Sequence, residues 1–310
     1  MHEHIARAIY YLSIHLLFAS IAAATAWALT STLRASATTK YWIWVATAFN
    51  FFLPTGALID KLWAPYFTWA YPLGVIGGPV WDMTQGRVAI ILAAVWAVGS
   101  LAMLTRLISR IRKEHRDAQT LAPLTNATPA SDFLADGVPV SFGDAHATPA
   151  VSGVLSPRIL LPAGLDRVLN PREFRAVLIH EVAHARRRDN LIRLFYEAAL
   201  CALWFHPFMW LAGARLSLYR ELSCDESVIQ RAHGHELVSA LAKLAIPKQS
   251  GLLQATASSH LTYRLALLSA PPQSASRFAS LLLVSLFFTV VAAGVFQTIA
   301  HTACCFITKH

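Results

Sequence analysis

His180-Glu181-Val182-Ala183-His184 is the stretch around which this sequence is organised. Two histidines four residues apart lie on one face of a helix, so both imidazoles can reach the same metal ion. The glutamate between them projects beside that pair, where it can hold and deprotonate a metal-bound water. The stretch therefore predicts a helix that carries two zinc ligands, His180 and His184, and a catalytic base, Glu181.

The predicted helix has a clear beginning. Asn170 suits the N-cap, Pro171 suits the first helical position, and Glu173 completes a capping-box pattern. The helix is expected to run through the histidine pair to about Arg188. Upstream of it, residues 158–162 predict a short strand closed by proline. The region around the histidines is therefore expected to combine helices with short strands.

A later helix is expected to supply the third metal ligand. In Glu221-Leu222-Ser223-Cys224-Asp225 the two acidic residues share one face of a helix, because they are four positions apart. Glu221 would complete a His-His-Glu set and leave the fourth coordination position of a single zinc ion for water. Asp225 would hydrogen-bond a ligand imidazole and fix its tautomer.

Three neighbouring side chains compete for these roles. Glu226 is offset from Asp225 by about 100° around the helix, so it aligns less well with the face of Glu221. Cys224 could approach a metal, although a small buried thiol more often has a packing role. Asp189, which follows three arginines, is either a contact at the C-terminal end of the first helix or a carboxylate that orients a ligand. Both interpretations of Asp189 stay open.

The composition indicates a membrane protein. The chain has 310 residues, of which 55% are hydrophobic and 14% charged, whereas an ordinary soluble domain carries about 25% charged residues. The net charge is +9, but the basic residues cluster beside apolar stretches, which favours a role in membrane topology over direct binding of nucleic acid. The four cysteines form no C-x-x-C pair, so neither a disulfide framework nor a cysteine-only metal site is indicated.

Several apolar stretches are candidate transmembrane helices. Each approaches the roughly 20 residues that about 30 Å of hydrocarbon requires. The first has no basic leader and is therefore expected to be a retained span. The candidates are residues 8–29, 41–60, 88–108 and 278–300.

Lysine and arginine in the connecting loops predict the orientation. Arg34 and Lys40 follow the first span and five basic residues follow the third, whereas the loop 61–87 carries only two. The positive-inside rule then places the amino terminus outside and the region after the third span in the cytoplasm. The expected parts are an N-terminal membrane region with three spans (1–108), a cytoplasmic zinc peptidase domain (109–276), and a fourth span with a short extracytoplasmic tail (277–310).

A further apolar stretch, residues 191–218, is difficult to interpret as a simple crossing. A single crossing would leave His184 and Glu221 on opposite sides of the bilayer, and two full crossings need roughly 40 apolar residues. Only 36 residues lie between those two side chains. Because His206-Pro207 falls near the middle, and proline breaks or kinks a helix, we expect a two-helix hairpin that dips into the membrane or packs on it. A fifth span is the alternative.

The motifs together resemble those of the BlaR/MecR-type antirepressor membrane metallopeptidases. The layout is similar over residues 1–300, while the specific motifs are confined to a shorter region. These motifs are the proline and glycine pattern of residues 149–162, the histidine helix with its arginines and Asp189 (180–190), Phe205-His206-Pro207, and residues 220–226.

The resemblance implies a polytopic α-helical protein of the bacterial inner membrane, with about four transmembrane helices and an inserted cytoplasmic, gluzincin-like α+β zinc peptidase domain. His180, His184 and Glu221 are the implied ligands, and Glu181 is the implied base. The strand around residues 158–161 is implied to pair with an extended substrate.

The expected function is regulated proteolysis of a cytoplasmic or membrane-associated protein. The resemblance suggests a small DNA-binding repressor, or the enzyme itself, as the substrate. Its best-known members continue past the fourth span into a penicillin-binding sensor domain, whereas this chain continues for about ten residues. A signal is therefore expected to come through the loop 61–87, through the spans, or from a separate sensor protein. The alternative is a non-catalytic membrane signalling subunit with a structural zinc, against which Glu181 argues, because structural sites need no base. Candidate oxyanion donors are His206, Tyr219 and Arg220.

Overall fold

The computed structural model describes most of the membrane region and of the expected peptidase domain. The loop 61–86, most of the expected fourth span at 278–300 and the tail 301–310 lie outside the described residues. The described residues are 2–52, 87–120, 137–143, 148–231 and 233–244, together with Arg264 and nine residues between 278 and 288.

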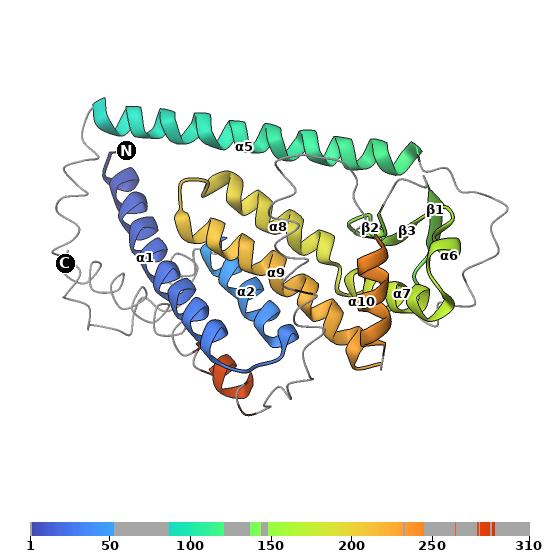
Figure 1. Cartoon of the computed structure of the whole chain (residues 1–310). Helices are drawn as coiled ribbons and strands as arrows, with labels where there is room; N and C mark the ends of the chain where they lie inside the picture. Colours follow the sequence, from blue (N-terminus) through green and yellow to red (C-terminus); the bar gives the residue numbers. More distant parts are fainter. Residues whose placement is uncertain are drawn as a thin grey trace.

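The described part is mostly helical, with three short strands. Helix α5 runs along one side of the molecule, and the strands, α6, α7 and α10 gather at the end farthest from α1 (Figure 1). In chain order the elements are α1 (His2–Thr32), α2 (Ala37–Phe52), α5 (Arg87–Thr120), β1 (Val140–Gly143), β2 (Ala150–Ser152), β3 (Arg158–Pro162), α6 (Leu165–Val168), α7 (Pro171–Arg187), α8 (Asp189–Ala202), α9 (Pro207–Ile229) and α10 (Gly234–Leu244).

Two helical segments are long and apolar enough to cross a membrane, His15–Thr32 in α1 and Ile90–Arg116 in α5. They overlap the expected first and third spans. No side chain of the α5 segment is buried within the protein, which suits contact with lipid. Helix α2 has 16 residues and covers only the first part of the expected second span, since residues 53–60 are outside the described part. The arrangement with four spans therefore remains a prediction.

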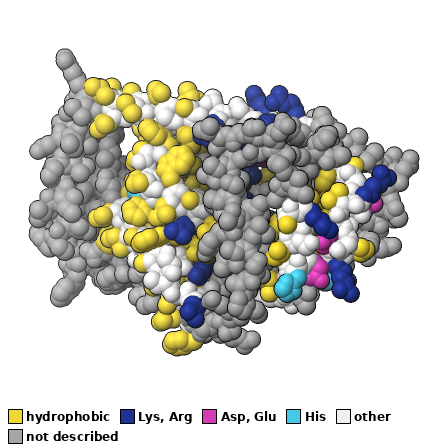
Figure 2. All heavy atoms as spheres, viewed as in Figure 1, with side chains coloured by type: hydrophobic (Ala, Val, Ile, Leu, Met, Phe, Trp, Pro, Cys, Tyr) yellow, Lys and Arg dark blue, Asp and Glu magenta, His cyan; other side chains and the backbone are white. Residues whose placement is uncertain are grey.

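The visible surface separates apolar from charged side chains. Among the described residues in this view, hydrophobic side chains gather over α1 and the first part of α5, Lys and Arg side chains lie on the later part of α5 and in the middle of the view, and the acidic and His side chains lie mainly toward α7 and α10 (Figure 2). This division is the one expected of a chain with a lipid-facing part and a water-facing part.

The small sheet supports the histidine helix. Its strand order is β1-β3-β2, with β1 parallel and β2 antiparallel to β3. Ile159 and Leu161 of β3 are almost completely buried because they pack against α7. The expectation that this strand pairs with an extended substrate is wrong, because β3 is the central strand and both of its edges are already hydrogen-bonded. Within the described sheet, only β1 and β2 offer an outer edge.

Helix α7 is buried on two faces. Phe174, Leu178 and Val182, which are spaced four residues apart, pack against the sheet. Ile179 packs on the other side against α9 and α10. Because a buried side chain of this size contributes roughly 1.5–3 kcal/mol, these contacts hold α7 firmly between the sheet and α9.

The apolar stretch 191–218 does not form one continuous helix. Helix α8 ends at Ala202, and α9 begins at Pro207, with His206 as an extended N-cap. The predicted break at His206-Pro207 is thus confirmed, and its cause is a proline that fits only the first turn of a new helix. Helix α9 then leads Glu221 back to α7. How α8 and α9 lie relative to a bilayer remains a prediction.

The N-terminal helices belong to the same body as the peptidase helices. Tyr41 and Trp44 of α2 are buried and pack in one cluster with Leu216 and Tyr219 of α9. The indole of Trp44 also donates a hydrogen bond to Thr30 Oγ1 of α1 at 3.2 Å. Helix α2 is therefore in direct contact with the helix that carries Glu221.

Helix α5 meets the turn between α8 and α9 at a glycine. A Cβ atom at Gly99 would lie 2.2 Å from the indole of Trp204, so no larger residue fits without movement. Close by, the indole of Trp96 donates to the carbonyl of Ala202 at 2.8 Å. These contacts attach the exposed helix α5 to the rest of the protein.

Candidate metal centre

The N-terminal end of α7 forms as the sequence predicts. The Asn170 side chain accepts hydrogen bonds from the backbone N–H groups of Arg172 and Glu173, and Glu173 Oε2 accepts one from the backbone N–H of Asn170 at 2.9 Å. This reciprocal cap contributes about 0.5–2 kcal/mol and fixes the start of the helix. The histidine pair lies in the second half of α7.

The C-terminal end of α7 turns sharply. Arg188 has φ 55° and ψ 46°, the left-handed conformation that glycine usually adopts at the end of a helix. Among the described non-glycine residues, Arg188 is the one with a positive φ. Helix α8 starts at the next residue, so Asp189 folds back toward His184. Because of this turn, Asp189 reaches His184 although it lies outside the stretch from His180 to His184.

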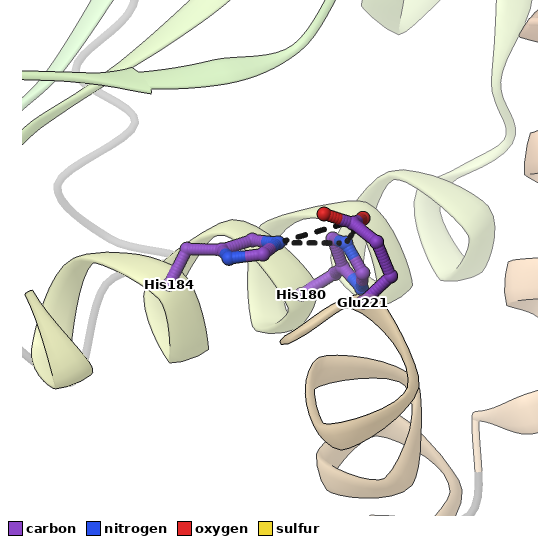
Figure 3. A group of neighbouring side chains, drawn as sticks. All are labelled: His180, His184 and Glu221. Atoms are coloured by element: carbon purple, nitrogen blue, oxygen red, sulfur yellow. Dashed lines mark hydrogen bonds and ion pairs between the residues drawn. The ribbon is translucent and has the colours of Figure 1, made fainter. Parts of the chain in front are cut away.

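The three predicted ligands are brought together. Nε2 of His180 and Nε2 of His184 are 3.2 Å apart, and Oε2 of Glu221 lies 3.7 Å from the first and 3.8 Å from the second (Figure 3). Ligand atoms of a tetrahedral zinc with bonds of 2.0–2.2 Å lie roughly 3.3–3.6 Å apart. The donor set and its spacing therefore fit one metal ion of this kind.

The group is buried on one side and open on the other. His180 and Glu181 are buried, whereas the side chains of His184 and Glu221 are 12% and 20% exposed. A substrate can thus approach past His184 and Glu221. Glu181 forms no hydrogen bond or ion pair with any described residue, and its charge contributes to the raised pKa of His180. Among the described residues, none holds the Glu181 carboxylate in a structural contact.

His184 is oriented by Asp189. Nδ1 of His184 lies 2.6 Å from Oδ2 of Asp189, which leaves Nε2 directed toward the other candidate ligands. Burial alone would raise the pKa of Asp189, but its hydrogen bonds with Arg187 and His184 lower that pKa to about 2. Of the two interpretations left open for Asp189, the geometry favours the carboxylate that orients a ligand.

Asp225 takes the corresponding place beside His180. Its Oδ1 lies 3.1 Å from Nδ1 of His180, although that nitrogen has no well-aligned hydrogen bond. Burial would lower the pKa of His180, but Asp225 and Glu221 outweigh it and raise that pKa to about 9. Burial likewise opposes ionisation of Glu221, yet His180, His184 and Arg220 hold its pKa well below the ordinary value. The carboxylates around the imidazoles therefore favour a bound positive charge.

Arg264 also belongs to this site and was not predicted. It donates to both carboxylate oxygens of Asp225, at 2.8 and 2.7 Å, and lies 3.3 Å from Oε2 of Glu221. Burial would lower the pKa of its guanidinium, but Asp225 and Glu221 raise it. No local pattern in the sequence marks Arg264, because it follows Glu221 by 43 positions and belongs to no motif.

The competing side chains have other partners. Glu226 accepts hydrogen bonds from the backbone N–H and the hydroxyl of Thr38, at 3.0 and 2.8 Å, and so caps the start of α2. Cys224 is buried and accepts a hydrogen bond from Arg187 at 3.1 Å, and burial raises the pKa of its thiol. Although Cys224 also lies near His184 and Asp189, the guanidinium of Arg187 occupies the space between that thiol and Asp189. We therefore do not treat this second group as a metal site.

The three candidate oxyanion donors lie in different places. His206 contacts Ser20 of α1 and Phe51 of α2, with its Nε2 at 3.2 Å from the Ser20 hydroxyl. The hydroxyl of Tyr219 donates to the carbonyl of Thr30 at 3.3 Å. Arg220 donates to Oε1 of Glu221 at 3.0 Å. Of these three, Arg220 is the residue that touches the candidate ligand set.

A set of two histidines and one glutamate is a donor set that zinc peptidases use. Residues 77–268 match the family described as BlaR1 peptidase M56, which is more than half of the chain, and the protein belongs to this family. Membership confirms the resemblance found in the sequence and implies a metallopeptidase.

Two regulatory proteins illustrate the relationship. Regulatory protein BlaR1 of Bacillus licheniformis is 32% identical over 83 residues, which are 27% of this chain and 14% of the relative. The methicillin resistance protein MecR1 of Staphylococcus aureus is 20% identical over 157 residues, which are 48% of this chain and 27% of the relative. The chain thus matches less than a third of the length of either protein, and it resembles a membrane-associated regulatory protease.

Proposed function

We propose that this protein is a membrane-embedded zinc metalloendopeptidase that cleaves a cytoplasmic or membrane-associated protein in a regulated way. The observation that carries the proposal is the triangle of His180, His184 and Glu221, with atoms 3.2 to 3.8 Å apart. Each imidazole in it has its Nδ1 beside a carboxylate, at 2.6 and 3.1 Å. Such carboxylates orient histidine ligands and raise their basicity.

A catalytic site explains this arrangement better than a structural one. Structural zinc sites close all four positions with protein ligands, whereas catalytic sites use three and leave one for water or substrate. Three ligands converge here, and the side toward His184 and Glu221 is partly exposed. The alternative of a non-catalytic signalling subunit would leave the buried Glu181 without a role.

In the proposed reaction, the metal ligands, the base and the two carboxylates beside the histidines have separate roles. Zinc bound at the three ligands would act as a Lewis acid that activates water and polarises the scissile carbonyl. Glu181 accepts the proton of the attacking water and later delivers it to the leaving amine nitrogen. Asp189 and Asp225 keep the Nδ1 atoms of His184 and His180 protonated, so that each Nε2 lone pair is free to bind.

The substrate is proposed to be a protein segment in extended conformation. Because β3 is enclosed, such a segment would add to an outer strand, and β2 is the outer strand that packs against α7. Asn190, at the start of α8, donates to the carbonyls of Val151 and Gly153 at 2.9 and 3.1 Å, and so fixes the position of β2 relative to the histidine helix. These carbonyls face away from β3, so a segment that adds to β2 would meet the Asn190 side chain there. The proposed substrates are a small DNA-binding repressor or the chain itself.

The proposed setting is the bacterial inner membrane. In this proposal the chain crosses it four times, with the amino terminus outside, the peptidase domain in the cytoplasm and the hairpin 191–218 against the membrane. The exposed apolar surface of α5 supports contact with lipid. The activating signal would come through the membrane helices or from a separate sensor protein.

Substitution of the base tests this proposal. The full-length chain in lipid nanodiscs is incubated with a peptide library, and the products are identified by mass spectrometry. Glu181→Gln is expected to retain zinc and to lose about 10²–10⁴-fold in cleavage rate. The exposed Asp166 on α6 provides a matched control, since Asp166→Asn makes the same chemical change away from the site. Equal cleavage by wild type and Glu181→Gln would refute the proposed role of Glu181.

A further inference from the structure

The first turns of α2 contact both helices that carry the candidate ligands. Tyr41 is 1% exposed, and its hydroxyl donates a hydrogen bond to Oδ1 of Asp189 at 2.7 Å. The other oxygen of the same carboxylate lies 2.6 Å from Nδ1 of His184. One carboxylate thus joins a helix of the membrane region to a candidate metal ligand.

From this relay we infer that Tyr41 is a positioning residue for His184, acting through Asp189. The inference rests on the proposed zinc site. Asp189 orients the His184 imidazole only if its carboxylate is held in one orientation, because Oδ2 must face Nδ1 of His184. The Tyr41 hydroxyl holds Oδ1, and Arg187 donates to both oxygens, so these contacts together set the plane of the carboxylate.

Arg187 completes the arrangement. Its guanidinium lies over the Tyr41 ring, 4.1 Å from the centroid, and donates to both oxygens of Asp189 at 2.6 Å. It also donates to the hydroxyl of Ser223 on α9 at 2.6 Å. The Tyr41 ring therefore lies against Arg187, whereas the Tyr41 hydroxyl donates to the Asp189 carboxylate. A substitution that removes only the hydroxyl separates these two contributions.

An open pocket lies beside the relay. Tyr41 and Asp189 line a space of about 270 Å³ together with Tyr196, Ser217 and Arg220. Space is therefore left beside the carboxylate, so its hydrogen bonds, rather than close packing on this side, hold its orientation.

The test measures zinc affinity of the full-length chain in nanodiscs by competition with a chelator. Tyr41→Phe removes only the hydroxyl and is expected to weaken zinc binding about 3–10-fold, less than the roughly 10–100-fold expected of Asp189→Asn. Tyr196→Phe is the control, because it removes another tyrosine hydroxyl, a partly buried one that donates its hydrogen bond to the carbonyl of Met209 and not to Asp189. The control is expected to stay within twofold of wild type.

A double variant separates positioning from a general loss of packing. In the Asp189→Asn background, Tyr41→Phe should cause no further loss of affinity, because its effect passes through Asp189. The visible absorption of the cobalt-substituted protein should shift in Tyr41→Phe and not in Tyr196→Phe. If Tyr41→Phe fails to fold, the pair Tyr41→Gln and Tyr41→Met replaces it, and the amide donor of glutamine is expected to retain more affinity.

The outcomes distinguish this inference from the proposed function. Wild-type affinity in Tyr41→Phe, or an equal loss in the presence and absence of Asp189, would overturn the role of Tyr41 and leave the zinc site intact. A wild-type chain that binds no zinc would overturn the proposed function, and the inference with it.

Discussion

Arg264 donates two parallel hydrogen bonds to Asp225, from Nε to Oδ2 at 2.8 Å and from Nη2 to Oδ1 at 2.7 Å. Its third nitrogen lies 3.3 Å from Oε2 of Glu221. A single side chain thus orients the carboxylate beside His180 and contacts the third candidate ligand. The metal centre depends on a residue that lies outside both of its motifs.

Removal of Arg264 is predicted to weaken the metal centre. Arg264→Ala leaves Asp225 buried without its counter-charge, and zinc affinity is expected to fall about 10–100-fold. Arg264→Lys keeps the charge but cannot bind both oxygens in parallel, so an intermediate affinity is expected. Chelator competition measures the effect, with the exposed Arg231→Ala as the control. Wild-type affinity in Arg264→Ala would show that Arg264 has no part in the site.

The attachment of α10 to α7 is predicted to weaken in acid. Hydrogen bonds from Lys243 and Ser239, with that of the Asn170 backbone, lower the pKa of Glu173 from 4.5 to about 2. Because the folded state holds the proton less tightly than the unfolded chain, this stabilisation is complete above pH 4.5 and is lost as the pH falls toward 2.

Comparison of wild type with Glu173→Gln tests this pH dependence. Glutamine keeps the capping pattern and removes the charge that faces Lys243. In thermal unfolding, the difference between the two proteins should be largest at neutral pH and should shrink below pH 4.5. A difference that is constant between pH 7 and pH 3 would contradict the assignment.

The left-handed turn at Arg188 is predicted to be better suited to glycine. Non-glycine residues pay roughly 1–2 kcal/mol for this conformation, so Arg188→Gly should unfold at a higher temperature. The β-branched Arg188→Val should lower the unfolding temperature and, by displacing Asp189 from His184, weaken zinc binding. The reverse order of the two variants would be inconsistent with the observed turn.

The contact between α5 and the α8–α9 turn is predicted to tolerate no side chain at Gly99. Gly99→Ala places a methyl group against the Trp204 ring and is expected to cost about 1–3 kcal/mol of stability. A second substitution, Trp204→Leu, should recover part of the loss by making room. Equal unfolding temperatures for wild type and Gly99→Ala would show that α5 does not approach so closely.

Local patterns in the sequence predicted the parts of the site that are local. The capping box at Asn170, the facing pair His180 and His184, and the break at Pro207 each depend on residues within a few positions of one another. Glu221 could be proposed because its helix also carries Asp225 at the required spacing. These features follow from helix geometry alone.

The remaining parts depend on contacts between distant segments. Tyr41 is 148 positions from Asp189, and Arg264 is 39 positions from Asp225, so no periodicity connects either pair. The position of β3 at the centre of the sheet was missed for a related reason, since it depends on pairing with two separate strands, one on each side. Glu226 was considered as a ligand because it follows Asp225, and its partner Thr38 belongs to a helix far away in the sequence.

X-ray absorption at the zinc edge is the measurement that tests the His180–His184–Glu221 centre. One zinc per chain is expected, with two imidazole nitrogens and a carboxylate oxygen at about 2.0–2.2 Å, and its affinity should fall at least about 100-fold in Glu221→Ala. A zinc–sulfur distance of about 2.3 Å would instead indicate Cys224, which lies near His184 and Asp189. That result, or unchanged affinity in Glu221→Ala, would contradict the His180–His184–Glu221 centre.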